Sequence, residues 1–157
     1  MRVVIVHTYY QKPGGEDQSV SSEAGTLRNH GHEVLLFTLH NRALADMFPT
    51  RQAALTLWND QVYRSLRAMI RRFKPDVVHI HNTFPLASPA AIHAAWIEQV
   101  PVVVTLRNYR LLCPVALFYR DGQVCEACLG KAVPWPGVLH GCWRGRLPSA
   151  VVAAMLS

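Results

Sequence analysis

Short apolar runs rich in β-branched residues alternate along the chain with longer segments of helical period. The runs that predict strands are residues 3–7, 34–39, 77–81 and 102–106. Each run is nearly continuous in apolar residues, which is typical of strands buried on both faces of a parallel sheet. Because parallel strands need crossover connections, the helical segments between them predict right-handed β-α-β units. The pattern therefore predicts an α/β fold with a doubly wound parallel sheet.

The helical segments have recognisable ends. The first begins soon after Gly14-Gly15 and closes at Gly31, a residue type that often terminates helices. The second is predicted over residues 50–73 as one long helix with an apolar stripe, and the third over 89–98. These helices supply the two layers that a doubly wound sheet requires.

Beyond residue 106 the pattern changes, because Pro, Gly and Cys become frequent and neither the helix nor the strand period persists. We interpret residues 107–147 as a Cys-rich insertion. An Ala- and Val-rich helix then opens at Pro148-Ser149 and is unfinished at Ser157. We therefore expect residues 1–157 to be an incomplete domain.

Composition narrows the class of protein. Half of the 157 residues are hydrophobic and 17% are charged, which excludes an intrinsically disordered chain. The net charge of +6 favours acidic partners such as phosphates, nucleic acid or an anionic membrane surface. Four basic residues form a stripe on the long predicted helix, interpreted either as a solvated face or as a contact with anionic lipid. They are Arg64, Arg67, Arg71 and Lys74.

No apolar run approaches the roughly 18–20 residues of a membrane-spanning helix. The N-terminal residues resemble a buried first strand more than a signal peptide. We therefore expect a cytoplasmic chain, in which the cysteines are thiols or metal ligands before they are disulfides.

Polar side chains gather where the predicted strands end, at the edge where open parallel sheets bind ligands. They are His7, His79, His81, Asn82, Arg107 and Asn108, with Gly14 and Gly15 in the loop after the first strand. His79 and His81 share one face of their strand, and His81 is favoured for ligand contact because it comes last. A glycine pair before a helix lets backbone N–H groups approach a phosphate, although a plain tight turn explains it equally well. Neither a dinucleotide fingerprint nor a P-loop motif is present.

The four cysteines have the spacing C-x11-C-x2-C-x13-C, at Cys113, Cys125, Cys128 and Cys142. The C-x2-C pair is a common chelating unit, so we interpret the set as a structural zinc site. Free thiols, a disulfide and an iron-sulfur cluster remain alternatives, and His140 is a substitute ligand. Four thiolates would close the coordination sphere, so such a metal would stabilise the segment without activating water.

Several segments, in their order and spacing, resemble the N-terminal half of glycosyltransferase family 4. These segments are GGE at 14–16, GHEV at 31–34, PDVVHIHN at 75–82 and PVVVTL at 101–106. A further stretch, NYRLLCP at 108–114 with CEACLGK at 125–131, is similar to one branch of that family. The resemblance implies a GT-B architecture, in which two Rossmann-like domains face a cleft and a sugar passes from a nucleotide donor to an acceptor with retention.

The resemblance also implies roles for individual residues. Gly14 and Gly15 match the loop that approaches the donor diphosphate, and Arg107 stands where many members carry a histidine that contacts the donor sugar. The acceptor would meet His7, His81, Asn82 and Asn108. Transfer would need no cofactor. The C-terminal donor-binding domain of the architecture is absent from residues 1–157, so we expect this chain alone to be inactive.

Two interpretations follow for the whole chain. The first is the acceptor-side domain of a retaining glycosyltransferase that builds polysaccharide or glycolipid at the inner membrane face, with peripheral contact to anionic lipid. The alternative is a zinc-stabilised binding module for nucleic acid or a partner protein, without catalysis. Nucleic acid is disfavoured because the basic residues are spread out and the polar strand ends would go unused.

Overall fold

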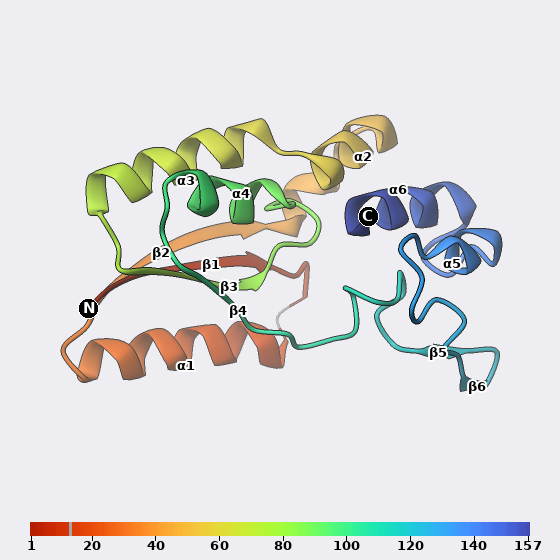
Figure 1. Cartoon of the computed structure of the whole chain (residues 1–157), viewed down its shortest axis with the longest axis horizontal. Helices are drawn as coiled ribbons and strands as arrows, with labels where there is room; N and C mark the ends of the chain where they lie inside the picture. Colours follow the sequence, from red (N-terminus) through yellow and green to blue (C-terminus); the bar gives the residue numbers. More distant parts are fainter. Residues whose placement is uncertain (13) are drawn as a thin grey trace. The chain divides into compact units, whose positions relative to one another are not determined.

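The computed structural model describes residues 1–12 and 14–157, and these form two compact units, 1–105 and 106–157 (Figure 1). The first unit contains a four-stranded sheet in which every pair of neighbours is parallel. Its strands, in the order β2-β1-β3-β4, are β1 (Arg2–Tyr9), β2 (Glu33–His40), β3 (Val77–Asn82) and β4 (Val102–Val104). The predicted fold class is confirmed, and the fourth strand ends two residues earlier than predicted.

Helices cover both faces of the sheet, as a doubly wound fold requires (Figure 1). On one face lies α1 (Gly15–Asn29), and on the other lie α3 (Asp60–Phe73) and α4 (Ala90–Ile97). The alternation of side chains along the strands sorts the apolar residues into two clusters. Val4, Val6, Val78 and Ile80 pack with α3 and α4, whereas Val3, Ile5, Val34 and Val77 pack with α1.

The long helix predicted over 50–73 is wrong, because the segment forms two helices, α2 (Pro49–Leu57) and α3. A short 3-10 turn, η1 (Asn41–Leu44), precedes them. Trp58 is extended, and the Asn59 side chain accepts a hydrogen bond from the Val62 N–H at 3.2 Å, capping α3. Asn59 also donates from Nδ2 to the carbonyl oxygen of Leu86. Capping and this long-range contact together stabilise the break.

The basic stripe of α3 is partly neutralised within the first unit. Glu98 accepts hydrogen bonds from Arg67 and from Arg71, the latter at 2.9 Å, and Arg64 pairs with Asp60 one turn earlier. The hydrogen bond from Arg71 is the main reason that the pKa of Glu98 lies below its ordinary value. Most of the stripe is therefore matched by carboxylates.

Both edges of the sheet expose apolar side chains. On β4, Val103 is 51% and Val104 41% exposed, and on β2, Leu35 and Leu36 are likewise exposed. Edge strands with unpaired backbone groups can pair with further strands.

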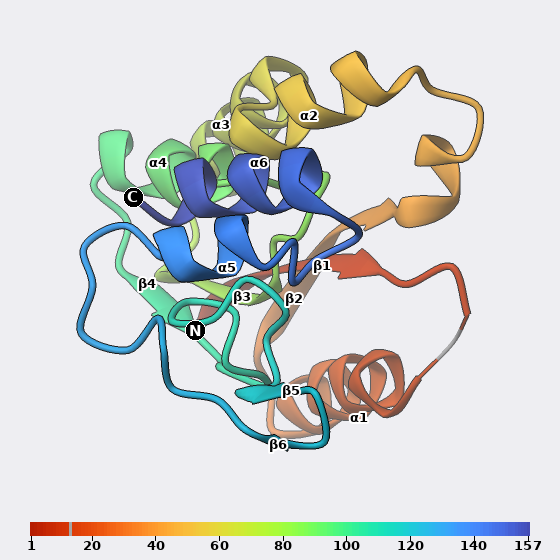
Figure 2. The same ribbon diagram turned by 90° about the vertical axis from the view of Figure 1, so that its right-hand side faces the viewer.

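The second unit has little regular structure. It contains a hairpin of β5 (Tyr119–Arg120) and β6 (Gln123–Val124), a short helix α5 (Trp135–Leu139), and α6 (Arg146–Leu156). Figure 2 shows α5 and α6 packed together. Within the described residues, no helix is both long and apolar enough to cross a membrane.

Candidate functional site

The carboxyl half of the sheet carries polar side chains on the face that α1 covers. On β1 and β3, Val4, Val6, Val78 and Ile80 point to the opposite face and pack in its apolar cluster. The residues between them, His7, His79 and His81, contact side chains of α1 instead. His79 and His81 therefore share a face, which confirms the prediction from alternation. The sheet thus presents imidazoles on one side only.

His7 is completely buried and pairs with Asp17 of α1. Its Nε2 lies 2.8 Å from Oδ1 of Asp17. Since a carboxylate only accepts, Nε2 carries the proton. Nδ1 of His7 and Oγ1 of Thr8 are buried without a hydrogen-bond partner in residues 1–12 and 14–157. Buried polar atoms of this kind are uncommon and point to a polar ligand or water at the end of β1.

The same carboxylate holds the glycine loop. Gly14 is the N-cap of α1, and its N–H donates to Oδ2 of Asp17 at 3.0 Å. Asp17 therefore ties the loop to His7, one oxygen for each. A Cβ placed on Gly14 or Gly15 would meet nothing within 4 Å, and Gly14 has φ −136°, a conformation open to any residue. The fold itself does not require glycine at these two positions.

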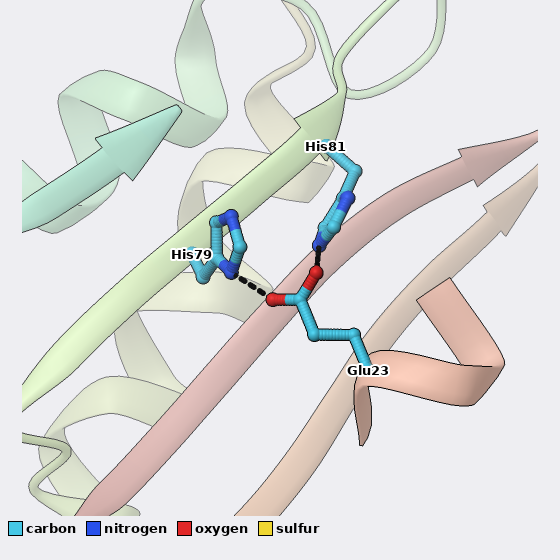
Figure 3. A group of neighbouring side chains, drawn as sticks. All are labelled: Glu23, His79 and His81. Carbon is cyan, nitrogen blue, oxygen red and sulfur yellow. Dashed lines mark ion pairs between the residues drawn. The ribbon is translucent and has the colours of Figure 1, made fainter. Parts of the chain in front are cut away.

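A second carboxylate from α1, that of Glu23, lies between the two imidazoles of β3 (Figure 3). Oε1 is 2.6 Å from Nδ1 of His79, and Oε2 is 3.5 Å from Nε2 of His81. The other nitrogen of His79, Nε2, lies 2.7 Å from Oγ1 of Thr105. One ligand atom from each of the three residues lies within 4.8 Å of the other two, a spacing that can hold a metal ion.

Asn82, predicted to contact the acceptor, is buried and holds the backbone. Its Nδ2 donates to the carbonyl oxygen of Thr8 at 3.0 Å, and its Oδ1 accepts from the N–H of Phe84 at 2.9 Å. The register between β1 and β3 shifts here, so that His7 pairs with Asn82. The amide therefore fixes the strand end and the loop that follows.

Aromatic rings pack against one another at the end of β1. The ring of Tyr9 stacks on that of His40 from β2, with centroids 4.7 Å apart, and meets His7 edge-on at 4.7 Å.

The hydroxyl of Tyr10 donates to Glu16 in the first turn of α1 at 2.8 Å. Both carboxylates of that turn, Glu16 and Asp17, are therefore already engaged.

Arg107 and Asn108 belong to the second unit, and both are exposed. Oδ1 of Asn108 accepts a hydrogen bond from the N–H of Arg110 at 2.9 Å, forming a turn. The other predicted site residues, His7, Gly14, Gly15, His81 and Asn82, all belong to the first unit.

The four cysteines all belong to the second unit, and within the described residues they form no disulfide. Cys113 and Cys128 are buried, and Cys125 and Cys142 are partly buried. Burial raises the pKa of the Cys128 thiol, and the charges of the other three cysteines raise it further. Burial likewise raises the pKa of Cys142. The Cys128 and Cys142 thiols therefore lose their protons less readily than an exposed thiol does.

Three partners of the predicted residues were not singled out by sequence reasoning as site residues: Asp17, Glu23 and Thr105. A signal for Glu23 exists, because it lies three residues after Val20 and next to Ala24, both of which are buried on α1. Asp17 stands three residues after the N-cap, the position from which an acidic side chain reaches back to the cap. Thr105 has no comparable local signal.

Comparison with known proteins gives one family. The family model described as Glycosyltransferase Family 4 matches residues 13–120. No curated protein matches the chain.

Proposed function

The chain belongs to glycosyltransferase family 4, and we propose that it is the acceptor-side, Rossmann-like domain of a retaining enzyme. In this proposal a sugar passes from a nucleotide-sugar donor to a polysaccharide or glycolipid acceptor. A second Rossmann-like domain outside residues 1–157 binds most of the donor, as the GT-B architecture implies, and residues 1–157 alone do not transfer sugar. The region matched by the family includes α1, β2, β3 and β4, whereas β1 with His7 lies before it.

The observation that carries the proposal is the glycine loop. The first backbone N–H groups of a helix lack intrahelical acceptors, and the helix dipole favours an anion beside them. Gly14 and Gly15 leave this end of α1 uncovered although the fold tolerates a Cβ at both. Glu16 is held by Tyr10, whereas Asp17 bonds both His7 and the N–H of Gly14. The proposed diphosphate contacts are therefore N–H groups of the first turn other than that of Gly14. A diphosphate is the ligand that suits such a loop.

The acceptor is assigned to the strand ends. His81 is the proposed contact on β3, and His7 and Asn82 act by holding the glycine loop and the loop after β3 in place. Arg107 remains the proposed contact for the donor sugar and Asn108 a contact for the acceptor. Arginine at that position stabilises negative charge on the departing diphosphate and does not act as a base.

The test is sugar transfer by the enzyme that includes the donor-binding domain. Radiolabelled nucleotide sugars are offered with a glycolipid fraction from the source cells. A double variant, Gly14→Leu with Gly15→Leu, should lower kcat/KM by roughly 100-fold or more, because a group that stabilises the leaving charge is displaced. Gly25→Leu is the matched control, since Gly25 lies on the same helix and is equally open. Unchanged transfer by the double variant would refute the loop's role.

We also propose a structural zinc on Cys113, Cys125, Cys128 and Cys142. Two observations support this proposal. The charges of the other three cysteines raise the pKa of Cys128, and few apolar side chains are buried in the second unit. Metal analysis of untagged protein should give zinc, and affinity should rise with pH because each thiol must lose its proton. A protein that retains no zinc at any pH would contradict this assignment.

We further propose peripheral contact with anionic membrane at the cytoplasmic face. Glu98 and Asp60 neutralise much of the α3 stripe, so the better support is Phe48 and Trp58, which flank α2 and are 81% and 42% exposed. Co-sedimentation with vesicles containing phosphatidylglycerol should fall when both are changed to Ser. If the variant sedimented with the vesicles as the wild type does, the proposed membrane contact would be refuted.

A further inference from the structure

We propose that Glu23, His79 and His81 form a binding site for a divalent transition-metal ion such as Zn²⁺, separate from the cysteine segment. The three side chains come from two elements, α1 and β3, and each directs a ligand atom toward the others (Figure 3). Two imidazoles and one carboxylate are a donor set that zinc accepts readily. This inference does not depend on the proposed function.

The backbone brings these ligands together for simple reasons. His79 and His81 are two residues apart on β3, so their side chains project from the same face of the sheet, and their ring centroids are 4.3 Å apart. Helix α1 crosses that face and places Glu23 opposite both rings. Neither the strand nor the helix has to be distorted to present the three groups.

The distances are close to those that an ion requires. Tetrahedral ligands about 2.0–2.1 Å from zinc lie roughly 3.3 Å from one another. Nε2 of His81 and Oε2 of Glu23 are already 3.5 Å apart. Nδ1 of His79 and Oε1 of Glu23, at 2.6 Å, form a hydrogen-bonded contact that an ion would widen. The Glu23 side chain is partly exposed, which leaves it room to rotate away from His79.

Thr105 provides the outer contact that metal-binding histidines usually have. Its Oγ1 lies 2.7 Å from Nε2 of His79. Because the Glu23 carboxylate only accepts, Nδ1 of His79 carries the proton in this structure, and Nε2 accepts from the Thr105 hydroxyl. When a metal replaces the proton on Nδ1, Nε2 is the protonated nitrogen, and the same hydroxyl can accept its hydrogen bond.

The burial of the three residues leaves a way in for the ion. The side chain of His81 is completely buried, that of His79 is 15% exposed and that of Glu23 is 32% exposed. An ion would therefore enter past the Glu23 side chain and lie against the buried ring of His81, away from solvent. Three protein ligands leave a fourth position for water or for an oxygen of an anionic ligand. With one carboxylate among its ligands, a divalent ion would bring net positive charge to this end of the sheet.

Cobalt titration of the untagged chain tests the site. Co²⁺ bound by thiolates shows sulfur-to-metal charge-transfer absorption, whereas Co²⁺ bound by nitrogen and oxygen does not, so the two proposed sites are distinguishable. The wild type should take up one equivalent without the thiolate signature. Glu23→Gln and His79→Ala should each lose that equivalent and retain any thiolate-bound one, and Zn²⁺ should no longer raise the melting temperature through this site.

The controls separate a metal site from a general loss of structure. Glu23→Gln preserves the size and hydrogen-bonding capacity of a partly exposed side chain, so the variant should fold. Glu16→Gln and His30→Ala, on or beside the same helix, should bind as the wild type does. Thr105→Val should weaken binding by about 10–100-fold. Metal uptake only with the thiolate signature, or equal uptake by the wild type and Glu23→Gln, would overturn the proposal.

Discussion

Both clusters of buried apolar side chains in the described residues belong to residues 1–105, whereas residues 106–157 bury few apolar side chains. The backbone differs in the same way. Within the described residues, the second unit has four non-glycine residues with positive φ, namely Ala116, Phe118, Asp121 and Arg144, and the larger first unit has three. The first unit is stabilised by regular layers packed on a sheet. The second depends on turns, and units of this size commonly need a metal or disulfides.

The contrast predicts that the two units respond to different perturbations. Changes to buried apolar residues should affect the first unit, and changes to the cysteines should affect the second.

The largest effect is expected from Cys128→Ser. Loss of one of four ligands should remove much of a zinc-binding free energy on the order of 10 kcal/mol, enough to unfold the second unit. Hydrogen–deuterium exchange should then be fast throughout 106–157 and unchanged in the sheet of the first unit. Slow exchange retained in both units would show that metal does not stabilise the second.

The next effect is expected from Leu66→Ala in α3. Leu66 is completely buried against the sheet, so its truncation should destabilise the first unit by about 2–5 kcal/mol through lost burial and a cavity. Urea denaturation measures this loss of stability, and hydrogen–deuterium exchange of the β1 and β3 amides shows that it belongs to the first unit. Leu57→Ala is the control, because Leu57 is 40% exposed and should cost far less. Comparable losses in the two variants would contradict the assignment of the core.

A smaller loss is expected from Asp17→Ala. Removing this carboxylate leaves Nε2 of buried His7 and the N–H of Gly14 without their acceptor, at a cost of about 1–3 kcal/mol. Chemical denaturation of the first unit is the measurement. Glu16→Ala removes a neighbouring carboxylate from a more exposed contact and should cost less; the reverse order would show that the buried pair does not hold the loop.

The smallest effect is a gain. Gly25 lies inside α1, and an added Cβ would meet nothing within 4 Å. Gly25→Ala should therefore stabilise the first unit by about 0.5–1 kcal/mol, because alanine loses less backbone freedom on folding. A raised melting temperature of the first unit would confirm it, and a lowered one would show that α1 packs more closely than its Cβ environment indicates.

The regular part of the fold was predictable because its cause is local. The apolar runs on β1 and β3 are strands buried on both faces, and the helix ends at Gly31 and Lys74 carry positive φ where the pattern stopped. The break at Asn59 was missed because apolar residues continue at helical spacing through it. It is fixed partly by Leu86 and by Ser88, whose Oγ accepts from the Asn59 N–H, and these contacts are distant in sequence.

In the candidate site, too, the features that one strand determines were predictable, and those that depend on the packing of α1 on the sheet were not. Alternation correctly placed His79 and His81 on one face, because that depends on one strand alone. Their partner Glu23 depends on how far α1 is shifted along β3, and no local pattern records such a shift. The same limit applies to Asp17 and His7, ten residues apart, which meet only once α1 has packed on the sheet.

The parallel register of β1 has a consequence for synthesis on the ribosome. Val3 pairs with Val34 and also with Val77, so β1 can pair with its second neighbour only after β3 has been synthesised. The four described strands are all available only when β4, ending at Val104, has emerged. Because the cysteines all follow, the nascent sheet can close before any thiol appears, and domain-wise folding from the N-terminus should keep the two steps apart. Long-range parallel pairing then sets the slow step of folding, and the cysteine segment follows it.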